Sequence, residues 1–271
     1  METLHINKDL LDSVKALNKH RSKTGRKDLS ELVYCDDYGA ITITDGVKLL
    51  YCISKQDNSL PLNNIVNYIF YSKYYKKCKV VMDDNKYIKA MLDTELVDIV
   101  DLRGYSYPNL KSLKFNFDIE LNFNLWSRKY INKKIDLINK FIKQYNDRCK
   151  LLRKECYNID DTQIIFSTNK DNLMDAYIRF TTADDDFKKS LTPEIRDACL
   201  LVNQHPIFYD IEWKVGFNYL QFVDCINAIN KIDSNNSIKF MFESTKPITS
   251  PIKIDTEEGS YTLLMPIRIN N

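Results

Sequence analysis

Short apolar runs separated by turn residues occur in both halves of this chain, and this recurrence limits the fold more than any other feature. In the first half, runs 32–35 and 40–44 flank one Asp-rich turn, and runs 79–82 and 87–92 flank another. Strand signals closed by such turns predict antiparallel hairpins. The same criteria predict strands at 47–53, 96–102, 163–168, 176–181, 238–242, 252–254 and 261–269.

Helical patterns are fewer, with two main helices in each half. A helix is expected over 8–19, with Asn7 as its N-cap, and a second begins at Pro61 and carries Ile65, Tyr68, Ile69 and Ser72 on its inner face. In the second half, helices are expected over 123–154 and 218–231, and Pro193 starts a short one. Few helices among many antiparallel strands predict an α+β fold.

The run 123–154 predicts one long helix with a narrow apolar seam. Apolar residues recur there at alternating spacings of four and three: Ile131, Ile135, Ile138, Ile142, Tyr145, Cys149 and Leu152. About 30 helical residues reach roughly 45 Å. Such a seam either packs on the protein's own sheet, which is the simpler interpretation, or drives a coiled-coil dimer.

Both halves repeat a pattern of two helices among short strands, which suggests a duplicated unit. With 271 residues the chain has room for two ordinary domains. We expect them at 1–115 and 116–271, the second containing the long helix as an insertion.

Positive charge is concentrated in the predicted helices and their ends. Residues 8–27, 66–79 and 123–154 carry net charges of +5, +4 and +8. Because the whole chain carries only +2, the remaining residues carry −15. Basic helices on an otherwise acidic protein are typical of a surface that meets a phosphate backbone, although a lysine-rich helix can also be simply a solvated face.

Cysteine spacing and hydropathy indicate a cytoplasmic protein. The seven cysteines include no CxxC pair, which favours reduced and mostly buried thiols in the cytosol. No run approaches 18 apolar residues, and the N-terminus lacks a signal-peptide pattern.

An enzyme is the first alternative that the residues suggest. The acidic pairs and triplet could indicate a metal-dependent nuclease, but each lies at a predicted turn, where Asp bonds to its own backbone. They are Asp36-Asp37, Asp83-Asp84, Asp160-Asp161 and Asp184-Asp185-Asp186. The three histidines are isolated, and no P-loop or nucleophile motif is present. We therefore expect no catalytic residues, no metal and no cofactor.

The C-terminal run 260–269 reads as a strand interrupted by Met265-Pro266, because proline cannot donate to a strand ladder. It resembles the closing M-P-x-R-L signature of the bacterial replicative sliding clamp, the β subunit of DNA polymerase III. Three further runs of this chain resemble motifs of the same family, and they occur in the same order as in that family. Residues 42–49 resemble the A-T-D-G-H-R-L element of that family's middle domain, with Val47 and Lys48 in place of His and Arg.

The remaining matches lie between and after these two motifs. Residues 61–69 resemble the helix that follows the first element, and 104–109 resemble the G-x-F-P-D run that closes the middle domain. Residues 217–229 resemble the family's F-N-x-x-x-x-x-D-x-L-x-A-L helix without gaps. These are elements of the middle and last domains, so the resemblance implies a shortened version with two tandem clamp domains, each with two helices packed on antiparallel sheets.

The resemblance implies a ring that encircles duplex DNA without reading its sequence. Family members close six such domains into a ring, so a two-domain chain would need a homotrimer. Basic side chains from the predicted helices would face the DNA phosphates. The candidates are Lys15, Lys19, Arg21, Lys23, Lys73, Lys76, Lys77, Lys133, Lys140 and Lys143.

The resemblance also implies a hydrophobic pocket that takes a short peptide from the DNA polymerase and from the clamp loader. Carried over by matching motif, its lining would be Thr44, Gly46, Lys48, Leu49, Leu263, Met265, Pro266 and Arg268. Ordinary core packing is the alternative role for the two C-terminal apolar side chains. A second functional alternative keeps the fold but not the ring: a clamp-like adaptor that binds replication proteins without encircling DNA.

Overall fold

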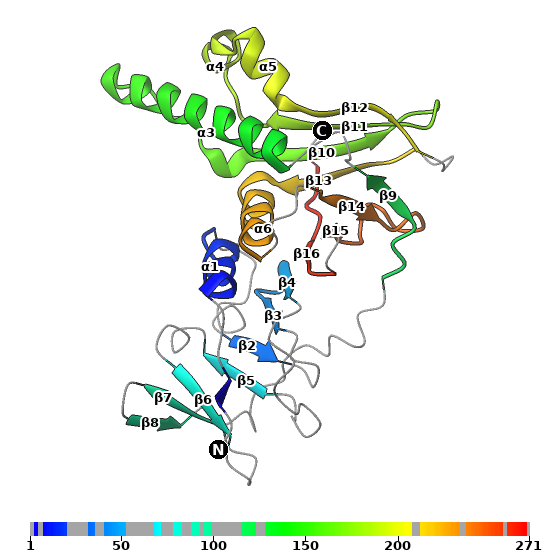
Figure 1. Ribbon diagram of the computed structural model, residues 1–271. Coiled ribbons are helices and arrows are strands. Elements are labelled where there is room, and N and C mark those ends of the chain that lie inside the picture. Colours follow the sequence, from blue (N-terminus) through cyan, green and yellow to red (C-terminus); the bar gives the residue numbers. More distant parts are fainter. Residues whose placement is uncertain are drawn as a thin grey trace. The chain divides into compact units, whose positions relative to one another are not determined.

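The computed structural model describes most of the second half of the chain and separate pieces of the first half (Figure 1). The described residues are 3–4, 8–20, 32–35, 41–52, 68–71, 78–82, 88–92, 95–98, 115–122, 128–207, 212–232, 237–256 and 259–269. Every structural statement below concerns these residues.

Two compact units make up the chain, and each includes segments from distant parts of the sequence. The first contains Met1–Lys114, Asp224–Ser234 and Thr256–Leu263, and the second contains the remaining residues. A division near residue 115 coincides with the start of the second unit, but the two later segments group with the first. The domain limits 1–115 and 116–271 stay a prediction.

The first unit contains two groups of paired strands and the helix α1 (Lys8–Leu17). One four-stranded sheet has the order β1-β6-β7-β8, with all its pairs antiparallel. Its strands are β1 (Thr3–Leu4), β6 (Cys78–Met82), β7 (Ile88–Leu92) and β8 (Glu95–Asp98). The predicted helix at 8–19 and hairpin at 79–92 are confirmed.

The other strands of this unit follow the order β5-β2-β3-β4-β16. They are β5 (Tyr68–Tyr71), β2 (Leu32–Cys35), β3 (Ile41–Thr44), β4 (Lys48–Cys52) and β16 (Tyr261–Leu264). The rings of Tyr51 in β4 and Tyr261 in β16 stack with centroids 5.0 Å apart. The hairpin of β2 and β3 confirms the prediction for 32–44, and the core there includes Ile43 and Leu50, both with no exposed surface.

The helix predicted after Pro61 is wrong over 68–71, where the chain forms β5 and pairs with β2. The residues Tyr-Ile-Phe-Tyr all favour strands, because aromatic and β-branched side chains fit a pleated surface. Their apolar spacing suits a helix equally well, so periodicity over so few residues could not discriminate. Residues 61–67 lie outside the described part of the chain.

The second unit contains a four-stranded antiparallel sheet with the order β12-β11-β10-β13. Its strands are β12 (Leu200–Pro206), β11 (Leu173–Phe180), β10 (Thr162–Thr168) and β13 (Lys214–Asn218). A further group has the order β15-β14-β9, formed by β15 (Ile252–Asp255), β14 (Lys239–Phe242) and β9 (Ile119–Asn122). Strands β9, β12 and β13 were not predicted.

The long helix α3 (Arg128–Leu151) runs beside the four-stranded sheet (Figure 1). Its seam residues Ile131, Ile135, Ile138 and Ile142 are buried. Ile131 lines a small void together with Phe166, Ala176 and Val202 of the sheet. These isoleucines therefore pack on the protein's own sheet, as the simpler interpretation predicted, and each contributes about 1.5 to 3 kcal/mol. Leu152, predicted as the last seam residue, lies beyond the helix and is 56% exposed, because the chain leaves the helical path there.

Two short helices pack against α3. The helix α4 (Asp185–Ser190) contacts its C-terminal half, where Phe187 meets the ring of Tyr145 at 4.8 Å. The helix α5 (Pro193–Cys199) confirms the helix expected at Pro193, and Thr192 caps it by accepting a bond from the Ile195 amide. The last helix, α6 (Tyr219–Ile232), confirms the helix predicted over 218–231.

The described cysteines agree with the expectation of mostly buried thiols. Cys52, Cys149 and Cys225 are buried, Cys199 is half-buried and Cys156 is exposed, and none of these five forms a disulfide. Burial raises the pKa of Cys52 to about 11 and that of Cys225 to about 12, which keeps both thiols protonated and unreactive. No described helix is both long and apolar enough to cross a membrane.

Candidate nucleic-acid interface and partner-binding loop

The face of α3 opposite its apolar seam is a strip of exposed charged residues. Its members recur at spacings of four and three: Lys129, Lys133, Asp136, Lys140, Lys143, Asp147 and Lys150. Within this strip Asp147 pairs with Lys150 at 3.7 Å, and no described residue forms an ion pair with Lys133, Lys140 or Lys143. These three lysines therefore project their charge into solvent from one face of a rigid helix.

Lys134 lies in the same helix but has a structural role. Its side chain is buried, and Nζ donates to the carbonyl oxygens of Asp197 at 2.6 Å and Leu200 at 2.7 Å. These carbonyls belong to the C-terminal end of α5, where the unsatisfied oxygens carry partial negative charge. The ammonium group thus joins α3 to α5 and does not belong to the exposed strip.

The other predicted DNA contacts are described only in part. Lys15 and Lys19 are both exposed, and Lys15 pairs with Asp12 at 2.7 Å. The rest lie outside the described residues: Arg21, Lys23, Lys73, Lys76 and Lys77.

The loop 44–49 is a tight turn between β3 and β4 that is held by its own side chains. Asp45 Oδ1 accepts from the amides of Val47 at 2.9 Å and Lys48 at 2.7 Å. Thr44 Oγ1 donates to the Lys48 carbonyl at 2.7 Å and accepts from the Gly46 amide at 3.0 Å. Gly46 has φ of 86°, a conformation that costs glycine little. The Thr-Asp-Gly sequence therefore determines the shape of this loop.

Lys48 connects this loop to a distant part of the first unit. Its Nζ lies 2.8 Å from Asp224 Oδ2, and both side chains have no exposed surface. The same ammonium donates to the carbonyl oxygens of Leu17 and His20. His20 completes the cluster, because its amide and its Nδ1 each lie 2.8 Å from an Asp224 carboxylate oxygen. A buried charge pair is sustained only when its remaining hydrogen-bonding positions are filled, as they are here.

The structure thereby brings together two motifs that the sequence shows separately. Lys48 takes the place of the arginine in the T-D-G-H-R-L element, and Asp224 is the aspartate of the run 217–229. Among the other predicted pocket residues of this unit, Leu49 and Leu263 are buried. His20 was not predicted, and an isolated histidine in a polar loop offers no periodicity that could have revealed it.

The C-terminal segment leaves its strand at Leu264 and continues with partly exposed side chains. Met265 is 36% exposed and Arg268 is exposed, whereas Pro266 is intermediate. Beyond the proline, the Ile267 amide donates to the Gly216 carbonyl at 2.8 Å. A Cβ added at Gly216 would lie 2.9 Å from Ile269 Cγ1, so glycine allows the close approach of this segment. The predicted interruption of the strand at Met265-Pro266 is confirmed.

No grouping of three or more His, Cys, Asp or Glu side chains in the described part of the chain could hold a metal ion. The acidic triplet begins with Asp184, whose Oδ1 accepts from the Phe187 amide at 2.7 Å and caps α4. Asp160 and Asp161 form a short 3-10 helix. Local backbone bonding thus explains Asp184, whereas Asn158 caps the 3-10 helix and Asp161 accepts from the Thr182 hydroxyl.

No protein-family model matches the sequence, and no curated protein matches it either. Solved structures do match. The DNA polymerase III β subunit from Thermotoga maritima aligns with 99% of this chain at a TM-score of 0.55 and 15% identity. The DNA polymerase sliding clamp from Bacillus subtilis aligns with 99% at 0.53 and 17% identity.

A third match is the Helicobacter pylori β clamp bound to a DNA ligase peptide, which aligns with 99% of this chain at a TM-score of 0.53 and 15% identity. The chain spans about two thirds of the length of these proteins, 66%, 65% and 68% in the order given. The α+β fold with antiparallel sheets is confirmed. This chain has the fold of the bacterial DNA sliding clamps, the β subunits of DNA polymerase III.

Proposed function

We propose that this chain is a DNA sliding clamp, a processivity factor that holds replication proteins on duplex DNA. The observation that carries the proposal is the alignment of nearly the whole chain with about two thirds of a clamp subunit. If each chain supplies two clamp domains, three chains would supply the six domains of a ring. Head-to-tail contacts close into a ring when the rotation from one chain to the next divides the circle evenly, as it does for three copies. The proposal assigns the protein no catalytic step, metal or cofactor.

The exposed lysine strip of α3 supports DNA binding without sequence recognition. Lys133, Lys140 and Lys143 lie on one helical face with no described ion-pair partner, as contacts to phosphate require. Phosphate contacts carry no base information, so they leave a clamp able to slide. Lys15 and Lys19 of the first unit are the other described residues that we propose to meet DNA.

The peptide pocket is the second part of the proposal, and it rests on the motif match. Met265 and Arg268 have the exposure that a partner-binding surface needs, and a methionine adapts to several related peptides. We assign Leu49 and Leu263 to its apolar wall, and Pro266 to the turn that presents Met265. Thr44, Gly46 and Lys48 act by fixing the loop. The DNA ligase peptide in the Helicobacter pylori complex is the natural probe.

The lysine strip provides the experiment. The triple variant Lys133→Glu, Lys140→Glu, Lys143→Glu should bind a short linear duplex at least tenfold more weakly at low salt. If all three lysines contact phosphates, the slope of log affinity against log salt should fall by roughly 3 for each copy that contacts DNA. Fluorescence anisotropy across a salt titration measures both quantities.

A matched control separates local contacts from net charge. Lys170, Lys214 and Lys246 are exposed and lie outside α3, so changing all three to Glu alters the net charge equally. This control should keep most of the binding. If both triple variants bind DNA like the unchanged protein, the DNA-binding proposal fails. Duplex binding lost equally in both would assign the effect to net charge and would contradict a role for the strip.

A further inference from the structure

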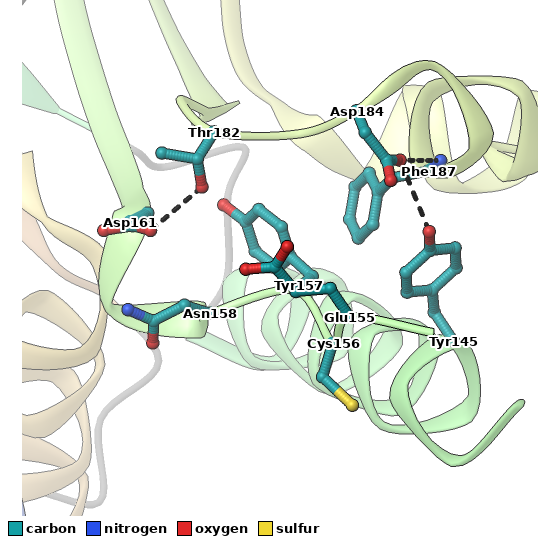
Figure 2. A pocket seen from close by; sticks show the side chains of 9 residues that line it. All are labelled: Tyr145, Glu155, Cys156, Tyr157, Asn158, Asp161, Thr182, Asp184 and Phe187. Carbon is teal, nitrogen blue, oxygen red and sulfur yellow. Dashed lines mark hydrogen bonds between the residues drawn. The ribbon is translucent and has the colours of Figure 1, made fainter. Parts of the chain in front are cut away.

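A cavity of about 280 Å³ lies at the C-terminal end of α3 (Figure 2). It is formed by the last turns of α3, the loop that follows them, the residues before β10, and the start of α4. Its lining residues are Tyr145, Glu155, Cys156, Tyr157, Asn158, Asp161, Thr182, Asp184 and Phe187.

Aromatic rings form one wall of this cavity. Phe187 lies between two tyrosines, with ring centroids 4.8 Å from Tyr145 and 4.4 Å from Tyr157. Figure 2 shows the three rings on one side of the site. Burial raises the pKa of Tyr157 to about 12, and its hydroxyl lies 3.0 Å from Thr162 Oγ1. The rings are neutral and their faces carry partial negative charge. Phe187 and Tyr157 are buried, and Tyr145 is the half-buried ring of the three.

Three carboxylates also line the cavity, beside the side chains of Cys156, Asn158 and Thr182. Glu155 has no described hydrogen-bond partner. Asp161 Oδ2 accepts from Thr182 Oγ1 at 2.9 Å, and Asp184 Oδ1 accepts from the Tyr145 hydroxyl at 3.4 Å. One oxygen of each of these two aspartates keeps its acceptor capacity. Among the described residues that line the cavity, none is a lysine, arginine or histidine.

Asn146, which does not line the cavity, also holds one of its walls in place. The Asn146 side chain accepts from the Tyr157 amide at 2.8 Å and donates to its carbonyl at 2.9 Å, which fixes the loop to α3. Lys154, the basic residue next to Glu155, pairs with Asp186 at 2.6 Å and does not line the cavity. The negative charge of the cavity therefore has no described cation within it.

We propose that this cavity binds the guanidinium group of an arginine presented by a partner protein. A flat cation that packs against aromatic rings and pairs with carboxylates fits a site whose described lining includes three rings, three carboxylates and no basic residue. The volume lies below that of most small-molecule pockets, which begin near about 300 Å³, so it suits one side chain better than a larger ligand.

Two exposed leucines close to Glu155 in the sequence favour a protein as the partner, because a peptide can present apolar side chains beside its arginine. Leu151 is 85% exposed and Leu152 is 56% exposed, and both lie within four residues of Glu155. An arginine flanked by apolar residues would use the cavity and these side chains together. The proposal is independent of the clamp function, because neither the lysine strip nor the C-terminal segment takes part.

The test uses the full-length protein and two capped pentapeptides, Ala-Leu-Arg-Leu-Ala and the same peptide with citrulline in place of arginine. Citrulline keeps the shape of the side chain and lacks its charge. The arginine peptide should shift the backbone amide NMR signals of Glu155, Thr182 and Phe187 at about millimolar concentration, the range expected of one weakly held side chain. The citrulline peptide should shift them at least tenfold less at the same concentration.

Two variants complete the experiment. Glu155→Gln with Asp184→Asn removes two charges and keeps the α4 cap, because asparagine caps a helix as well as aspartate does. This double variant should bind the arginine peptide at least tenfold more weakly. Glu194 is an exposed acid on α5, and Glu194→Gln should leave the affinity for the peptide unchanged. Equal shifts with both peptides, binding unchanged in the double variant, or no shift with the arginine peptide would each overturn the proposal.

Discussion

At the scale of single residues, burial decides which charges belong to the fold and which remain available for binding. Lys48 and Lys134 are lysines like those of the strip, yet each has an almost fully buried side chain and oxygen partners from another element. Burying an ammonium group without partners would cost several kcal/mol, so such a position requires the acceptors that surround it. Lys133 precedes Lys134 by one residue, and the turn of the helix alone places it in solvent.

The buried pair of Lys48 and Asp224 should be essential to the stability of the first unit. The substitution Asp224→Asn leaves the Lys48 ammonium buried without its counter-charge, so the free energy of unfolding should fall by roughly 3 to 5 kcal/mol. Urea unfolding followed by circular dichroism measures the loss.

A double variant makes this prediction specific to the pair. Adding Lys48→Met to Asp224→Asn removes the uncompensated charge and should recover much of the lost stability. The surface pair of Lys15 and Asp12, with side chains 54% and 31% exposed, is the control, and Lys15→Met should cost less than about 1 kcal/mol. Additive effects of the two substitutions at 48 and 224 would contradict a coupled pair.

At the scale of elements, the C-terminal segment combines anchored and exposed residues. Leu264 has no exposed surface, and Ile267 is bonded to Gly216. Met265 lies between these two anchors and Arg268 follows the second, and both side chains are partly in solvent. Deleting the whole segment would therefore remove core contacts, whereas single side-chain truncations leave the anchors in place.

Truncating the two exposed side chains tests the proposed peptide pocket. The variant Met265→Ala, Arg268→Ala should bind the ligase-derived peptide at least tenfold more weakly, because it loses an apolar wall and a cation without losing Leu264 or Ile267. Isothermal titration calorimetry measures the affinity, and an unchanged thermal midpoint shows that the fold is intact. Ile248→Ala removes an apolar side chain that is 60% exposed elsewhere, and it should bind the peptide normally. Peptide affinity equal in both variants would show that the pocket is assigned to the wrong residues.

At the scale of the whole molecule, domain number determines how many copies a ring needs. One chain has a mass of 31.9 kDa, so a closed homotrimer should have about 96 kDa. Light scattering over a range of protein concentrations measures this mass, and a closed ring should keep it on dilution. A stable monomer or dimer would be incompatible with encirclement by this chain alone and would favour the adaptor alternative, in which the same fold binds replication proteins without enclosing DNA.

Much of the secondary structure could be read from the sequence because it depends on neighbours along the chain. The seam of α3 follows from apolar residues three and four positions apart, and the turn at Thr44-Asp45-Gly46 follows from side chains that bond to their own backbone. The strand break at Met265-Pro266 follows from a missing amide hydrogen. Local rules failed at β5, because the run Tyr-Ile-Phe-Tyr fits the apolar spacing of a helix and of a strand equally well. Pairing with β2 makes this run a strand.

The sequence by itself therefore determined the fold class, the main helices, the basic face of α3 and the clamp-like motifs, all of which depend on residue type and spacing. Only the tertiary structure decided that Lys48 pairs with Asp224, 176 positions later in the sequence, and that Lys134 is buried while Lys133 is not. It alone assembled Tyr145, Glu155, Asp161 and Asp184 around one cavity. The physical reason is that burial and charge pairing are properties of the surroundings of a side chain, and distant segments supply those surroundings only when the chain folds.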